Sequence, residues 1–97
     1  MVITNYVVAE TYTLLRYRRG TFVSLEFLRR IKATPTIHKV LVPEAWEEEA
    51  EELLARYRDQ AFSYVDATSF VVMRKLGLRE VLTFDADFSV GGFTVLS

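Results

Sequence analysis

The sequence predicts an α/β fold of three layers, with a mostly parallel sheet that helices cover on both faces. Two observations lead to this fold class. Short segments rich in β-branched residues alternate with longer amphipathic segments along the 97 residues, and several connections between strands are long enough to be helical crossovers. A content of 51% hydrophobic and 26% charged residues supplies one modest core, so we expect a single domain over residues 1–97.

Four segments are predicted to be strands. They are short and rich in β-branched or aromatic residues, which is typical of strands. They are Val2–Thr4, Thr36–Val42, Val81–Phe84 and Phe93–Leu96.

The segment after the first strand predicts a helical hairpin. Asn5 can cap a helix that runs to Arg19, and Gly20 follows at the position that favours a left-handed residue. Thr21 can cap a second helix, which ends at Thr34–Pro35 because the residue before a proline avoids the helical region. We therefore expect two helices joined by a tight turn at Gly20.

Two further helices separate the second and third strands. After Pro43, apolar residues recur at the spacing of an amphipathic helix, at Trp46, Ala50, Leu53, Leu54 and Tyr57. Ser63 can cap a helix that reaches Leu76, with Gly77 behind it. The predicted order is β-α-α-β-α-α-β-β.

Acidic residues stand where the predicted structure changes type. Glu10 lies in the helix after the first strand, Asp66 starts a helix, and Asp85 and Asp87 follow a strand. Ligands of open α/β sheets bind outside the carboxyl ends of the strands, so we expect a carboxylate cluster there. Crowded carboxylates raise one another's pKa unless they hold a hard cation such as Mg²⁺ or Mn²⁺. Oxygen ligands also disfavour zinc or copper.

Each of these acids also has a structural interpretation. Asp66 stands three residues after Ser63, which is the spacing of a capping box. Asp85 and Asp87 are also typical turn residues, and Glu10 could be an exposed helix acid. From the residues alone, both interpretations stay open.

Other polar residues point less clearly to chemistry. His38 lies in a predicted strand away from the acids and is interpreted as structural. The long helix carries an acidic run that could be imagined as a metal cluster but is more typical of a solvated helix start favoured by the helix dipole. Its members are Glu44, Glu47, Glu48, Glu49, Glu51 and Glu52.

Composition excludes some function classes. There is no cysteine and hence no disulfide or thiolate site, and neither a Ser-His-Asp arrangement nor a P-loop is present. Apolar runs are too short to cross a membrane, and the N-terminus lacks a positively charged leader, so we expect a cytoplasmic protein.

The net charge of −1 hides a division along the chain. Residues 1–40 hold seven Lys and Arg against two acids, a net charge of +5, whereas residues 41–97 have a net charge of −6. The basic residues could line a nucleic-acid path or form a solvated helix surface. They include Arg16, Arg18, Arg19, Arg29, Arg30 and Lys32.

Three segments in order, TNYVVAETYTLL, FSYVDATSFVVMRKLG and VLTFDADF followed by GFTVL, resemble the PIN-domain family, specifically the VapC-type toxins. The resemblance covers nearly all of the chain. By this likeness, Glu10, Asp66 and Asp85 match acidic metal-site positions, Asp87 is a further acid, and Thr83 is a supporting hydroxyl residue.

The resemblance implies cleavage of RNA phosphodiesters by metal-activated water, dependent on Mg²⁺ or Mn²⁺, usually in a homodimer that a cognate antitoxin restrains. Arg16 and Arg19 would then guide the RNA backbone. Family members carry a strand with the first acid, and one or two helices, before the segment that corresponds to Val2–Thr4, so we expect an N-terminally truncated PIN-like domain. Two alternatives remain: a catalytically impaired fragment that binds an antitoxin or itself, and a plain α/β domain whose acids are caps and turns.

Overall fold

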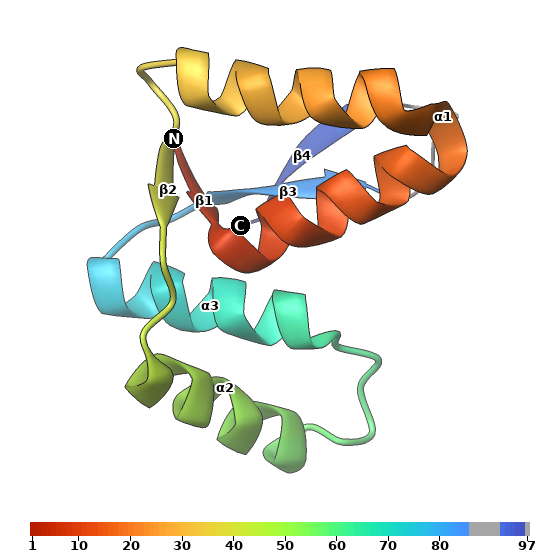
Figure 1. The fold of residues 1–97 in the computed structure, drawn as a ribbon. Helices are drawn as coiled ribbons and strands as arrows, with labels where there is room; N and C mark the ends of the chain where they lie inside the picture. The colour runs from red at the N-terminus through yellow and green to blue at the C-terminus, as the bar shows by residue number, and fades with distance from the viewer. Residues whose placement is uncertain (86–91, 97) are drawn as a thin grey trace.

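The computed structural model describes residues 1–85 and 92–96, with side chains described as far as Thr83. The order of its helices and strands is close to the predicted one (Figure 1). They are β1 (Val2–Thr4), α1 (Asn5–Ala33), β2 (His38–Val40), α2 (Glu44–Arg56), α3 (Tyr64–Leu76), β3 (Val81–Asp85) and β4 (Gly92–Leu96).

Helix α1 is the predicted hairpin, two helical arms joined by a sharp bend. Gly20 has φ 87° and ψ −179°, a conformation that favours glycine, and the two arms of α1 fold back against each other there (Figure 1). The hydroxyl of the buried Ser24 donates to the carbonyl oxygens of Gly20 and Thr21, at 3.1 and 2.9 Å. These bonds hold the start of the second arm against the turn.

The cap of α1 differs from the prediction. Thr4, not Asn5, is the N-cap, and its Oγ1 accepts a hydrogen bond from the Val7 N–H at 3.1 Å. Asn5 is already helical, and its Oδ1 accepts from the Val42 N–H at 2.9 Å. Both residue types are good caps, and this contact with the chain ahead of α2 decides between them.

The strands form two pairs within the described residues. β1 and β2 are parallel, with Val2 opposite His38 and Thr4 opposite Val40. β3 and β4 are antiparallel, with Val81 opposite Leu96, and β1 lies in contact with β3. The α/β class is confirmed, and β2 is shorter than predicted because its partner β1 has only three residues.

The helical segments are stacked in an order that differs from their order along the chain. Figure 1 shows the two arms of α1 above α3, with α2 farthest from the hairpin. Ser63 and Gly77 bound α3 as predicted, with a capping box at the first and left-handed φ of 64° at the second. This arrangement brings the starts of α1 and α3 close together around β1.

The core is centred on α3. Val72 packs with Val42 and Val81 beneath the strands, and Val71 packs with Ala50 and Ala67 between α2 and α3. Small side chains at the α2–α3 contact let the two helices approach closely. No helix in the described part of the chain is long and apolar enough to cross a membrane.

Candidate active site

Glu10 and Asp66 come from two helices and meet at one place. Glu10 lies in the second turn of α1, and Asp66 in the first turn of α3. Partial desolvation and, second, the negative charge of Asp66 raise the pKa of Glu10 above its ordinary value. Asp66 is half-buried, whereas Glu10 keeps access to solvent. The pair therefore forms a local excess of negative charge that a cation would relieve.

Asp66 also caps its own helix. Its Oδ2 accepts from the Ser63 N–H at 3.1 Å, and the Ser63 Oγ accepts from the Asp66 N–H at 3.0 Å. The capping box fixes the carboxylate in one orientation. Capping and a role beside Glu10 are therefore compatible, because the cap uses one of the two carboxylate oxygens.

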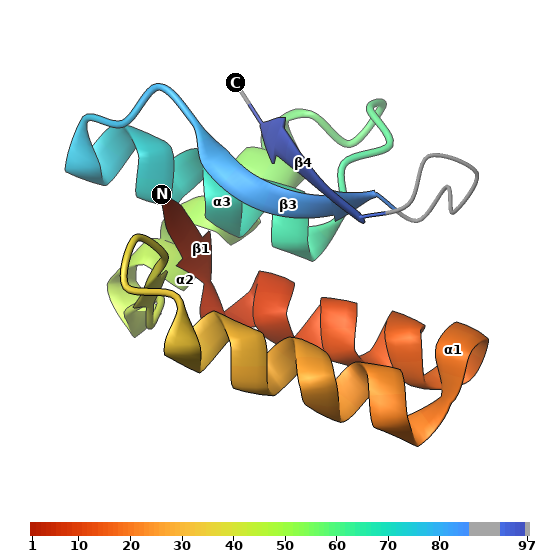
Figure 2. The ribbon, with the colours of Figure 1, turned by 90° about the horizontal axis from the view of Figure 1, so that it is seen from above.

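The backbone of β3 sets the position of the third predicted acid. Asp85 is the last residue of β3 and pairs with Gly92 of β4, but its side chain lies outside the described residues, as does Asp87 altogether. Figures 1 and 2 both show the end of β3 on the same side of the molecule as the start of α3. Thr83 is half-buried in β3, opposite Thr94.

The described donors suit a hard cation in kind. Within the described part of the chain no group of three or more His, Cys, Asp or Glu is gathered, so the described set is the pair Glu10 and Asp66. Two buried hydroxyls on the same two helices, Thr11 Oγ1 and Ser69 Oγ, have no hydrogen-bond partner among the described residues. Oxygen donors of this kind fit Mg²⁺ or Mn²⁺, with Asp85 as the further carboxylate that the sequence predicts.

A tyrosine–glutamate cluster next to these acids was not foreseen from the sequence. The hydroxyls of Tyr6 on α1 and Tyr64 on α3 both donate to Glu47 Oε2 of α2, and Tyr64 also donates to Glu51 Oε2 at 2.9 Å. Hydrogen bonding to Glu47 raises the pKa of Tyr6, and hydrogen bonding to Glu51 raises that of Tyr64. The sequence signal was the glutamate run on α2, but its partners are set only by tertiary packing.

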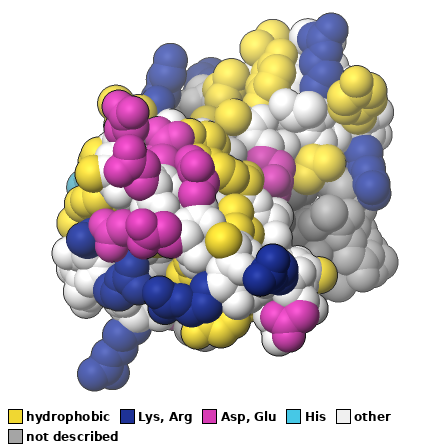
Figure 3. Space-filling model, turned by 90° about the horizontal axis from the view of Figure 1, so that it is seen from below, with side chains coloured by type: hydrophobic (Ala, Val, Ile, Leu, Met, Phe, Trp, Pro, Cys, Tyr) yellow, Lys and Arg dark blue, Asp and Glu magenta, His cyan; other side chains and the backbone are white. Residues whose placement is uncertain are grey.

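The rest of the glutamate run divides between pairing and solvent. Glu49 accepts from Lys75 Nζ at 2.8 Å and from Arg74 at 3.1 Å, which ties α2 to the end of α3. Glu44, Glu48 and Glu52 are exposed. Figure 3 shows acidic side chains gathered on the face that α2 presents, with Lys and Arg beside them.

The basic residues are distributed along both arms of α1. Arg16 Nη1 donates to Thr21 Oγ1 at 2.9 Å near the bend, and Arg19 is exposed at the end of the first arm. Arg29 and Arg30 pair with Glu26 on their own helix, and these bonds lower the pKa of Glu26 to about 2. Arg29 and Arg30 are therefore paired with an acid of their own helix.

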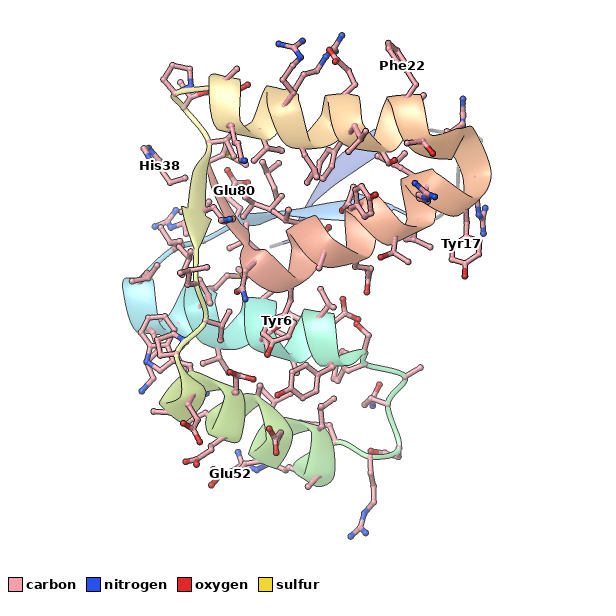
Figure 4. The ribbon with its side chains drawn as sticks, in the orientation of Figure 1. Tyr6, Tyr17, Phe22, His38, Glu52 and Glu80 are labelled. Atoms are coloured by element: carbon pink, nitrogen blue, oxygen red, sulfur yellow. The ribbon has the colours of Figure 1, made fainter. Side chains whose placement is uncertain are left out.

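His38 has the position that the sequence suggests. Its backbone N–H donates to the Met1 carbonyl at 2.8 Å within the β1–β2 pair. Its side chain is exposed and is directed away from the helices that carry the acids (Figure 4).

Comparison with known proteins gives consistent matches. Residues 1–93 match the family described as "PIN domain". The chain is 40% identical over 90 residues to the 23S rRNA-specific endonuclease VapC20 of Mycobacterium tuberculosis, covering 93% of this chain and 68% of that protein. It is 31% identical over 91 residues to a VapC ribonuclease of Archaeoglobus fulgidus, of which it spans 56%.

A solved structure agrees with these sequence matches. The crystal structure of Mycobacterium tuberculosis VapC20, described as a Sarcin-Ricin loop cleaving toxin, superimposes with a TM-score of 0.77 at 39% identity. The superposition covers 96% of this chain and 71% of that chain. Fold and sequence therefore point to the same relatives.

Proposed function

The chain belongs to the PIN-domain family, among the VapC-type toxin ribonucleases, and we propose that it cuts RNA with Glu10, Asp66 and Asp85 around Mg²⁺ or Mn²⁺. The observation that carries this proposal is the meeting of Glu10 and Asp66. Two helices distant in sequence bring like charges together, and the charge of Asp66 contributes to the raised pKa of Glu10. Such an arrangement disfavours the ionised form of Glu10 unless a cation binds there.

The residues of the chain divide the work at this site. A bound divalent cation would supply Lewis acidity to activate water and to stabilise charge on the phosphodiester oxygens. Glu10 and Asp66 would hold it from the helices and Asp85 from the end of β3, with Asp87 as a further acid. The capping box orients the Asp66 carboxylate, and Thr83 would be the hydroxyl residue that supports the site.

The proposed substrate is a structured ribosomal RNA. The VapC20 relative is named as specific for 23S rRNA, and the matching crystal structure is of a toxin that cleaves the Sarcin-Ricin loop. On this chain, Arg16 and Arg19 lie on the arm of α1 that also carries Glu10. Arg16 is six residues beyond Glu10, about 9 Å along the helix axis and about 120° around it, so its contact with a phosphate near Glu10 would depend on the reach of its long side chain. Such an RNA substrate is consistent with a cytoplasmic location.

Protein interaction is the second candidate function, and a specific observation favours it. The α1 hairpin exposes large apolar side chains, with Tyr17 at 86% and Phe22 at 81% exposure (Figure 4). An apolar pocket of about 470 Å³ lies along the second arm. Its lining includes Leu15, Phe22, Val23, Phe27 and Ile31. We propose that the cognate antitoxin covers this surface, and homodimerisation is the other use that it suits.

Cleavage of a Sarcin-Ricin loop oligonucleotide tests the leading proposal. The purified chain should cut this RNA with Mn²⁺ and not with chelator. Glu10→Gln and Asp85→Asn should each lower the rate by about 100-fold or more, whereas Glu52→Gln, an exposed acid on the outer face of α2 (Figure 4), should not change it. A folded chain that binds the antitoxin but does not cut RNA would favour the interaction function instead.

A further inference from the structure

We propose that Tyr6 and Tyr64 are positioning residues for the candidate active site, acting through Glu47. This inference rests on the proposed metal-dependent function. Tyr6, Tyr64, Glu47 and Glu51 are called the tyrosine brace below. Its members come from α1, α2 and α3, so the brace links all three helices near the two described acids.

The brace joins the two tyrosine hydroxyls to two carboxylates of α2. Tyr6 and Tyr64 both donate to Glu47 Oε2, the second at 3.3 Å, and Tyr64 donates to Glu51 Oε2 at 2.9 Å. The two rings also meet edge to face, with centroids 5.5 Å apart and planes at 61°. Figure 4 shows Tyr6 between the first turn of α1 and the two helices α2 and α3. Rings and hydroxyls therefore fix both the distance and the relative rotation of the tyrosines.

Each tyrosine lies within about one helical turn of one of the acids on its own helix. Tyr6 and Glu10 are four residues apart on α1, which places them on one face, about 6 Å apart along the axis. Tyr64 and Asp66 share the first turn of α3. Fixing the two tyrosines against Glu47 consequently fixes the two helix turns that carry Glu10 and Asp66.

Apolar packing alone would hold these turns less strictly. The apolar contact between α2 and α3, which includes Ala50, Ala67 and Val71, is not directional. Hydrogen bonds to a carboxylate are directional and stronger than those between neutral groups. Residues that orient metal-binding groups typically change metal affinity or activity by about 10- to 100-fold when mutated. The brace is well placed to have such an effect.

Substitution by phenylalanine tests the brace while keeping its rings. Tyr6→Phe and Tyr64→Phe should each weaken Mn²⁺ binding by about tenfold, measured by calorimetry on the whole chain. The kcat on RNA at limiting Mn²⁺ should fall in parallel, the KM for RNA should stay unchanged, and added Mn²⁺ should restore kcat. Tyr57→Phe is the matched control, since Tyr57 packs on Phe62 away from the brace, and it should change none of these values.

Glu47 offers a second pair of variants. Glu47→Gln keeps an acceptor oxygen and should retain Mn²⁺ affinity within about threefold, whereas Glu47→Leu should behave like Tyr6→Phe. If the Tyr and Leu variants lower only the melting temperature, with Mn²⁺ affinity and kcat as in the wild type, the positioning role is refuted and the brace is a stabilising contact.

Failure of the proposed function is distinguishable from failure of the brace. A wild-type chain that neither binds Mn²⁺ nor cuts RNA would overturn the proposed function. Amide hydrogen exchange without metal then decides the brace by itself. Faster exchange in the first turn of α3 on Tyr6→Phe, but not on Tyr57→Phe, would support it, because the affected helix is not the mutated one. Unchanged exchange there would overturn it.

Discussion

The α2–α3 pair and the α1 hairpin use similar residue types in opposite ways. In the α2–α3 pair, apolar residues are buried and Glu49 reaches across to Arg74 and Lys75 of the other helix. Around the bend of α1, Tyr17 and Phe22 are exposed, and among the described residues Glu26 forms its ion pairs within its own arm. The side chains of the α2–α3 pair form contacts within the protein, whereas those around the bend of α1 are exposed at the surface.

The difference indicates where stability and where recognition reside. Ion pairs and apolar contacts between helices stabilise the fold. Ion pairs within one helix do not join it to another element, so its outer face stays accessible to a partner. Glu10 and Asp66 lie between the two regions, at the starts of α1 and α3. Substitutions on either side should therefore give different phenotypes.

The largest expected effect is on the α2–α3 contact. Ala67 is fully buried against Ala50 and Val71, so Ala67→Leu should force the helices apart and lower the free energy of unfolding by about 2–3 kcal/mol. Phe22→Ser at the bend should change it by less than about 0.5 kcal/mol. Urea unfolding measures both. Equal effects would mean that the exposed bend is part of the core.

Two buried threonines at the beginning of α1 differ in their hydrogen bonds. Thr4 Oγ1 caps α1, whereas Thr11 Oγ1 has no partner among the described residues, although both side chains are fully buried. Thr4→Val should destabilise the chain by about 1 kcal/mol, and Thr11→Val should be neutral or stabilise it by up to about 1 kcal/mol. Thermal unfolding of the two variants compares them. A loss of Mn²⁺ affinity on Thr11→Val would instead assign that hydroxyl to the metal site.

Glu10→Gln should give a smaller effect that depends on pH. Burial and Asp66 raise the pKa of Glu10 above its ordinary value of 4.5, so the folded chain binds a proton more tightly than the unfolded chain does. Stability therefore falls as pH rises from about 4.5 through the raised pKa, and the ionised carboxylate is a cost at pH 7. Glu10→Gln should raise the melting temperature at pH 7 and not at pH 4. The gain should shrink in an Asp66→Asn background, and a gain of equal size there would show that desolvation alone is responsible.

The smallest expected effect is on the second arm of α1. Arg29 and Arg30 hold the pKa of Glu26 at about 2, so its contribution is present above the ordinary value of 4.5 and is lost as pH falls through about 2. Glu26→Gln should speed amide exchange in that arm at neutral pH and leave α2 and α3 unchanged. High salt should reduce the difference, because the pair is exposed. Slower exchange on Glu26→Gln would contradict a stabilising pair.

Local features of this fold were predictable from the sequence, and features that depend on distant partners were not. The turn at Gly20, the capping box of Ser63 and Asp66, and Gly77 behind α3 depend on a few neighbouring residues. The cap at Thr4 could not be predicted, because a contact 37 residues away engages the competing Asn5.

The same distinction applies to the candidate site. Glu10 and Asp66 could be singled out because each lies in the first two turns of a predicted helix, and the structure brings them together. The tyrosine brace was missed because α2 supplies its acceptors to two other helices. Asp85 and Asp87 stay predictions, since their side chains lie outside the described residues.

The bend at Gly20 constrains handedness and leaves room to spare. A Cβ placed there would meet no atom within 4 Å among the described residues, yet the backbone angles of 87° and −179° are almost closed to L-amino acids. Their mirror image is an ordinary extended conformation. A chemically synthesised chain with D-alanine at this position should therefore fold as the natural one does, whereas L-alanine should strain the hairpin. What the bend excludes in an L residue is therefore its handedness and not its size.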